Sequence, residues 1–203
     1  MRLLLTTFVV FLSTHALATA DDEFKPLLDG RSLEGWHGDP ALWSVEDGMI
    51  VGSTDEKQIE RNSFLAIKQP YANFVLRLKF KMRNGNSGVQ IRSKQHDDYV
   101  VRGYQADIAD GRYMGILYEE GGRGILADVK PEEIMQHVNK DDWNEYVITA
   151  DGPHIKQVLN GHTTADYTEE SDVGATSGII ALQLHVGPKM KIWFKDLEIK
   201  ELP

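Results

Sequence analysis

Six polar side chains on three segments have the types and the spacing for ligand binding and proton transfer. They form three pairs, each two residues apart and flanked by apolar residues: Gln90 with Arg92, Gln105 with Asp107, and Gln183 with His185. In a β-strand this alternation places the apolar residues in the core and the polar residues together on the opposite face. Amides and a guanidinium offer hydrogen-bond groups in fixed geometry, and a carboxylate or an imidazole can transfer a proton.

The three segments would form one site if their strands share a sheet. A polar residue on a single strand is more often a solvated surface position, but the coincidence of three strands favours a site. On a curved sheet the shared face is a groove, which suits a small polar ligand such as a sugar. Tyr118 could offer an apolar platform to a sugar ring, and Asn86 lies in the glycine-rich turn before the first of these strands.

Motifs of several common enzyme classes are absent from the sequence. It contains no GxSxG, HExxH, P-loop or dinucleotide-binding motif, and no cysteine that could act as a nucleophile. A glycosidase with two carboxylates would need a positioned pair, for which Asp107 with Glu119 or Glu120 could serve. Asp, Glu and His side chains are also metal ligands, so the sequence neither requires nor excludes a divalent metal ion.

Short strands dominate the patterns that must position these side chains. Residues 74–82 alternate most clearly, and residues 43–52 form an expected hairpin that closes at Asp47-Gly48. Further strands are expected at residues 64–67, 89–93, 99–107, 143–150, 155–159, 162–167, 179–186 and 192–200. Residues 115–124 are expected to be irregular, and residues 131–138 form the single expected helix. Many short strands with Gly and Asn turns predict an all-β sandwich or jelly roll.

Residues 1–20 have the pattern of a cleaved secretory signal. Arg2 supplies a positive charge, residues 3–12 are apolar, and Ala18-Thr19-Ala20 fits the small-x-small cleavage rule. We expect residues 21–203 to form one domain, and the absence of cysteine from an exported chain fits a bacterial periplasmic or secreted protein. The formal charge of −9 argues against nucleic acid or an anionic membrane as a partner. The oligomeric state stays open.

Longer motifs resemble one protein family along nearly all of residues 21–203. They are FKPLLDGRSLEGWHG, WSVEDGMIVG, YANFVLRLKFKMRNGNSGVQIRS, VRGYQADI, GILYEEGGRGIL, DDWNEYVITADGPHIKQVLNG and SGIIALQLHVGPKMKIWFKDLEIKEL. In this order they are similar to the 3-keto-disaccharide hydrolase domain family, formerly a domain of unknown function. The resemblance implies a concanavalin A-like jelly-roll β-sandwich, related to laminarinase-like glucanases, with a concave ligand-binding face. It also implies a sugar substrate, namely a glycoside oxidised at C3.

A ketone at C3 acidifies the proton at C2, so a base can remove that proton while the aglycone leaves C1. Addition of water to the resulting enone completes a net hydrolysis. We expect Asp107 or His185 to be the base. Arg92, with Gln90 or Gln183, would stabilise the enolate-like oxygen.

Two further residues receive roles from the resemblance. Glu119 is a candidate acid or hydroxyl-binding group, and Arg123 is a candidate for orienting it. Gln105, Asn86 and Tyr118 are the remaining expected sugar contacts.

Two other functions remain open at this point. A conventional laminarinase-like glucanase would need a compact acidic strand motif, which the sequence does not show. A carbohydrate-binding module without catalysis would need a flatter aromatic platform. It would have little use for Arg92, Asp107 and His185 together.

Overall fold

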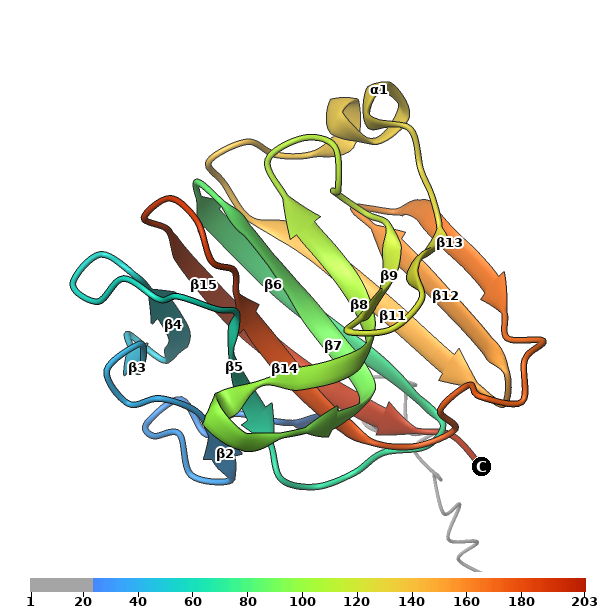
Figure 1. Cartoon of the computed structure of the whole chain (residues 1–203), viewed down its shortest axis with the longest axis horizontal. Helices are drawn as coiled ribbons and strands as arrows, with labels where there is room; N and C mark the ends of the chain where they lie inside the picture. The colour runs from blue at the N-terminus through green and yellow to red at the C-terminus, as the bar shows by residue number, and fades with distance from the viewer. Residues whose placement is uncertain (1–23) are drawn as a thin grey trace, which may run out of the picture.

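Residues 24–203 are described by a computed structural model, in which two antiparallel β-sheets pack face to face (Figure 1). The expected secretory signal of residues 1–20 lies outside the described residues. Within the described part of the chain, no helix is both long and apolar enough to cross a membrane. The predicted all-β jelly-roll sandwich is confirmed.

The larger sheet has eight strands and forms the back layer of the sandwich in Figure 1. Its main path runs β13-β12-β11-β6-β15-β4-β3, and β1 (Lys25–Pro26) pairs with β15. The bounds are β3 Trp43–Glu46, β4 Met49–Ser53, β6 Phe74–Arg83, β11 Asn144–Asp151, β12 His154–Leu159, β13 His162–Thr168 and β15 Lys191–Glu201.

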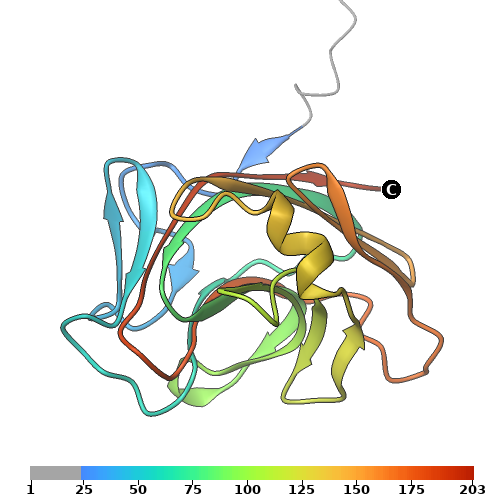
Figure 2. The ribbon, with the colours of Figure 1, turned by 90° about the horizontal axis from the view of Figure 1, so that it is seen from above.

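The smaller sheet has seven strands and carries the polar residues singled out in the sequence. Its order is β10-β9-β8-β7-β14-β5-β2. The bounds are β2 Trp36–His37, β5 Ser63–Ile67, β7 Asn86–Gln95, β8 Val101–Ala109, β9 Leu117–Glu120, β10 Gly124–Ala127 and β14 Ile179–Leu184. The central strands β8, β7 and β14 are therefore neighbours, as a shared site requires. Viewed from above, the two sheets form separate layers, and the helix lies across the middle of the view between them (Figure 2).

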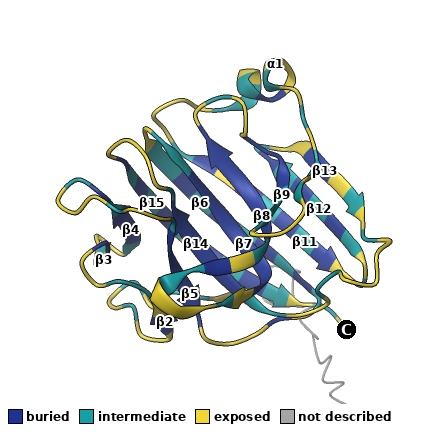
Figure 3. Ribbon diagram, in the orientation of Figure 1, coloured by how far each residue is buried: buried dark blue, intermediate teal, exposed yellow. Residues whose placement is uncertain are grey.

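The core lies between the two sheets and follows the period-two alternation of their strands. In β6, Phe74, Leu76, Leu78 and Phe80 are buried, whereas the residues between them are partly exposed. From the smaller sheet, Val89, Ile91, Tyr104, Ala106, Leu182 and Leu184 join the same cluster. Buried residues accordingly run along the central strands of both layers (Figure 3). Removal of this apolar surface from water is the main stabilising contribution to the fold.

A second, smaller apolar cluster covers part of the other face of the seven-stranded sheet. It consists of Phe64 and Ala66 of β5, Val101 of β8 and Ala181 of β14, with Ile179 packed against it. Because these residues occupy the non-core face, the neighbouring polar side chains on that face are buried as well. Gln90, Gln105 and Gln183 are each at most 2% exposed.

Three expected elements differ from the observed ones. Residues 115–124 are not simply irregular, since β9 and β10 form a hairpin there, with Tyr118 paired to Ile125. The expected helix is only the four-residue α1 (Pro131–Ile134) followed by a 3₁₀ turn at Met135–His137. β8 begins at Val101 because residues Asp97–Tyr99 form a 3₁₀ turn, in which Asp98 and Tyr99 have left-handed backbone angles.

Candidate functional site

A cavity of about 640 Å³ opens on the non-core face of the seven-stranded sheet. It receives side chains from four of the sheet's strands and from the ends of two others. The lining residues are Asn62, Asn86, Gln105, Asp107, Tyr113, Tyr118, Glu120, Gly124, Ile125 and His185. Five of the ten expected site residues line it: Asp107, His185, Gln105, Asn86 and Tyr118. Two more, Gln90 and Gln183, do not line the cavity but form hydrogen bonds with residues that do.

A continuous set of hydrogen bonds runs beneath the cavity floor. Ser93 Oγ donates to Gln90 Oε1 at 2.6 Å, and Gln90 Nε2 donates to Gln105 Oε1 at 2.7 Å. Gln105 Nε2 then donates a short hydrogen bond to Asp107 Oδ1. Because each amide accepts on one side and donates on the other, the order fixes which atom of Gln105 faces Asp107. The network presents an N–H donor to this carboxylate and holds it in place.

Asp107 is a buried carboxyl with an unusual proton affinity. Its side chain lies in β8 and only 4% of the residue is exposed. Burial raises the pKa of Asp107 to about 7, assisted by the nearby charge of Glu120 and opposed by the hydrogen bond from Gln105. A carboxyl with this pKa exchanges its proton near neutral pH. That property suits a general base or acid in a cavity.

Glu120 is the second carboxylate in the cavity, and two amides hold it. Asn62 Nδ2 donates to Oε1 at 3.1 Å, and Gln183 Nε2 donates to Oε2 at 3.3 Å. Gln183 also accepts from Gln105 Nε2 at 3.4 Å. Gln105 and Gln183 therefore link the two carboxylates, Asp107 and Glu120, through their side chains.

His185 and Asn86 lie beside each other at the cavity edge. His185 follows β14, and its backbone N–H donates to the Asn86 carbonyl at 3.3 Å. The Nδ1 atom of His185 lies 2.6 Å from the Val186 carbonyl, so Nδ1 carries a hydrogen there and Nε2 is left as the basic nitrogen. The side-chain oxygen of Asn86 is buried and has no hydrogen-bond partner. It is therefore available to a ligand hydroxyl.

Arg92 lies outside this group, although it was expected to act in it. A register shift between Ile91 and Lys94 and a φ of +46° at Arg92 interrupt the alternation of β7. The guanidinium donates to the Ala72 and Gly152 carbonyls at 2.7 and 2.6 Å, and to Asn73 Oδ1 at 3.0 Å. It ties the end of β7 to loops of the other sheet and does not line the cavity.

Glu119 and Arg123 are also placed away from the cavity. Arg123 Nε donates to Glu119 Oε2 at 2.7 Å, and Arg123 Nη2 donates to Glu169 Oε2 at 2.6 Å. Tyr104, which faces the core, donates through its hydroxyl to the same Glu169 oxygen at 2.7 Å. These side chains join the β9–β10 hairpin to the segment after β13, and we call them the Arg123 clasp.

Five cavity residues were not among the expected site residues, namely Asn62, Tyr113, Glu120, Gly124 and Ile125. Of these, Glu120 had been considered only as a carboxylate partner of Asp107. Tyr118 and Glu120 are two residues apart in β9 and share a face, whereas Glu119 points to the opposite face. Once Tyr118 is taken as a ligand contact, strand parity selects Glu120. Asn62 directly precedes β5, and no pattern in the sequence marks it.

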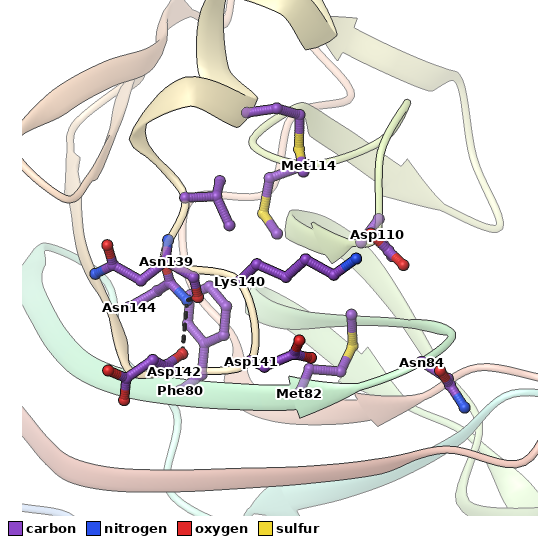
Figure 4. Close-up of a pocket in the computed structure, with 13 residues that line it drawn as sticks. Phe80, Met82, Asn84, Asp110, Met114, Asn139, Lys140, Asp141, Asp142 and Asn144 are labelled. Carbon is purple, nitrogen blue, oxygen red and sulfur yellow. Dashed lines mark hydrogen bonds between the residues drawn. The ribbon is translucent and has the colours of Figure 1, made fainter.

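A second cavity of about 280 Å³ lies at one end of the sandwich, near the helix (Figure 4). The side chain of Lys140 extends toward Asp110 (Figure 4). The apolar part of the cavity consists of Phe80, Met82, Ala109, Met114, Met135 and Val138. None of the expected site residues lines it. Within residues 24–203, no three His, Cys, Asp or Glu side chains are grouped so that they could hold a metal ion.

The chain belongs to the family of 3-keto-alpha-glucoside-1,2-lyase-like domains, whose family model matches residues 23–200. No curated protein matched the sequence. Two solved structures from Parabacteroides distasonis, each named a "putative glycosyl hydrolase", are similar at a TM-score of 0.66. One is 26% identical and the alignment covers 88% of this chain and 99% of that one. The other is 21% identical, with 92% and 99% covered.

A carbohydrate binding module of Bacillus subtilis shares the fold. It is 14% identical at a TM-score of 0.63, with 82% of this chain and 96% of that chain covered. The family and the 26% identical structure place this protein among carbohydrate-active domains.

Proposed function

We propose that this domain cleaves 3-keto-glucosides by elimination, followed by hydration of the product. The observation that carries the proposal is Asp107, a buried carboxyl with a pKa of about 7 at the floor of the cavity. Removal of a carbon-bound proton needs a base stronger than an ordinary carboxylate, and burial supplies that strength. Membership of a 3-keto-alpha-glucoside-1,2-lyase-like family agrees with this chemistry.

Asp107 is the proposed base. It takes the proton from C2, and the electrons of the C2–H bond form an enolate with the C3 ketone. The enolate then collapses: the ketone returns, a C1–C2 double bond forms, and the C1–O bond breaks with its electrons going to the aglycone oxygen. The products are a 2-hydroxy-3-keto-glycal and the aglycone alcohol. Addition of water across the C1–C2 bond completes the hydrolysis.

Glu120 or His185, in its protonated form, would protonate the leaving oxygen, since both line the same cavity as Asp107. The side-chain amides of Gln105 and Asn86 are the proposed contacts to the sugar's ketone and hydroxyls. In this assignment Glu120 takes the acid role first expected of Glu119. The amides take the polarising role first expected of Arg92.

The test is to incubate the purified protein with methyl 3-keto-glucoside and with methyl glucoside. We expect ultraviolet absorbance from the enone and release of methanol only from the 3-keto compound. Asp107→Asn should lower kcat by at least about 100-fold, a typical contribution of a general base. The control is Asp47→Asn, which changes an exposed aspartate in the β3–β4 turn of the other sheet.

Three results would contradict the proposal. Turnover of the ordinary glucoside alone would indicate a conventional glucanase. Saturable sugar binding with no turnover of either compound would indicate a binding module. Full activity in Asp107→Asn would exclude the assigned base chemistry.

A further inference from the structure

Exposed apolar side chains gather at the mouth of the cavity. Among residues 24–203, four large hydrophobic residues are notably exposed: Tyr113 at 49%, Ile125 at 41%, Val186 at 38% and Val173 at 74%. Tyr113 and Ile125 line the cavity, and Val186 directly follows His185, which also lines it. Apolar surface of this kind, gathered around an opening, marks a place where an apolar group of a ligand or partner binds.

The apolar side of the cavity consists of side chains that strand pairing and ion pairs hold in place. Tyr118 of β9 and Ile125 of β10 are directly paired across the hairpin. Tyr113 comes from the loop before β9, where Arg112 beside it forms a two-bond ion pair with Asp128 at 2.8 Å for each bond. The Arg123 clasp holds the far end of the same hairpin. Tyr113, Tyr118 and Ile125 are called the hairpin wall below.

The cavity is divided between this wall and a polar half. Asn62, Asn86, Gln105, Asp107, Glu120 and His185 supply the polar half. Apart from its two phenol hydroxyls, the hairpin wall carries no polar side-chain atom. No Lys or Arg belongs to the lining residues in the described part of the chain, whereas two carboxyl groups do. The described lining of the cavity therefore offers no permanently charged cation to an anionic ligand.

We infer that the hairpin wall binds the aglycone and selects a neutral, apolar one, with an aromatic ring preferred over a second sugar. This inference rests on the proposed function, because it divides one 3-keto-glucoside between the two halves. The sugar carries the hydroxyls and the ketone, so it takes the half with amides and carboxyls. A second sugar against Ile125 would lose water from the hydroxyls that face the wall without gaining hydrogen-bond partners there, which is costly. A flat ring instead covers Tyr113 and Ile125.

The test compares 2-phenylethyl 3-keto-glucoside, methyl 3-keto-glucoside and 3-keto-cellobiose. The three leaving groups are all alkyl alcohols, so differences in rate report recognition more than leaving-group chemistry. We expect the wild-type kcat/KM for the phenylethyl compound to exceed the values for the other two by about tenfold or more. Tyr113→Ala and Ile125→Ala should each remove most of this advantage, measured as the ratio of kcat/KM for the phenylethyl compound to kcat/KM for the methyl compound. Tyr113→Phe, which keeps the ring, should retain it.

Val173→Ala is the matched control, since it removes an exposed apolar side chain that does not line the cavity. It should leave all three kcat/KM values unchanged. If the wild-type kcat/KM for the methyl compound or for the disaccharide equals that for the phenylethyl compound, the inference is overturned and the proposed function stands. Equal losses on the methyl and phenylethyl compounds in the wall variants would also overturn it. If the wild type turns over none of the three, the proposed function falls together with the inference.

Discussion

The side chain of Gln105 occupies the space that a side chain on Gly88 would need, on the face of the seven-stranded sheet. A β-carbon on Gly88 would lie 2.5 Å from Cδ of Gln105. Gly88 is paired in register with Asp107, and Gln90 is paired with Gln105. The missing side chain of Gly88 thus lets Gln105 lie along the sheet and reach the Asp107 carboxyl. Strand β7 therefore contributes to the site in two ways: Gly88 leaves room for Gln105, and Gln90 forms a hydrogen bond with it.

Gly88→Ala should therefore displace the amide of Gln105 from Asp107. We expect kcat to fall by at least about tenfold, because a small misplacement of a positioned group is costly. Overpacking should lower the free energy of unfolding by about 1–3 kcal/mol, measured by urea denaturation. The double variant Gly88→Ala/Gln105→Ala should recover the stability but not the activity. Additive losses in both quantities would show that the two residues do not compete for this space.

Asp107 should make stability depend on pH in a direction unusual for a carboxyl. Its pKa in the folded protein is raised to about 7, above the ordinary value of 3.8. The folded state thus holds this proton more tightly, and the stability from the neutral carboxyl is present below pH 4 and lost as the pH rises toward 7. Asp107→Asn removes the titration, so the variant should be more stable than the wild type at pH 8 and similar to it near pH 4.

Urea denaturation of both proteins from pH 4 to 8 measures this difference, and taking the difference cancels groups common to both. A gap in unfolding free energy that is constant across the range would show that Asp107 is not a buried titrating group. The same group should shape the activity. The wild-type kcat/KM is expected to rise with pH through the region near 7, as the base form appears.

The Arg123 clasp should stabilise the protein above the acid range. Arg123 holds the pKa values of Glu119 and Glu169 below their ordinary values. For a depressed carboxyl the stabilisation is present above the ordinary pKa and is lost as the pH falls through the lowered one. Arg123→Met should lower the free energy of unfolding at pH 7 by about 2 kcal/mol, as expected for lost hydrogen bonds to charged groups. This difference should shrink below pH 4.

Lys130→Met provides a comparison, because Lys130 and Glu133 form an exposed pair at 71% and 60% side-chain exposure. Its effect on stability should be within about 1 kcal/mol at every pH, as for other surface ion pairs. If Arg123→Met behaves like Lys130→Met, the clasp is only a surface contact.

Arg92 is expected to matter for stability more than for chemistry. Arg92→Met leaves the Ala72 and Gly152 carbonyls and Asn73 without their donor. We expect a loss of about 3 kcal/mol in the free energy of unfolding, the cost of breaking a buried charged network. The kcat of the folded protein, measured well below its unfolding temperature, should change by less than about threefold. A 100-fold loss of kcat in a fully folded variant would contradict this expectation and would show that Arg92 acts in catalysis.

Strand alternation was enough to predict the sandwich and the shared face of Gln90, Gln105, Asp107 and Gln183, because period-two burial is a local property of the chain. It failed at Arg92, where a register shift and a left-handed backbone conformation break the period. It was not used at Glu119, whose role came from the family resemblance. The segment of residues 115–124 was not expected to contain a strand, so its parity was not applied. Asn62 could not be found at all, because it reaches Glu120 only through the pairing of distant segments.

The hairpin wall stands at the edge of its sheet, whereas Gln105 and Asp107 lie on an interior strand. The two halves of the cavity therefore differ in how freely they can change during evolution. An edge hairpin can be lengthened, shortened or recomposed without disturbing the strands inside the sheet. Related chains could thus acquire different ligand preferences by altering residues 110–127, with the same central amides and carboxyls retained beneath.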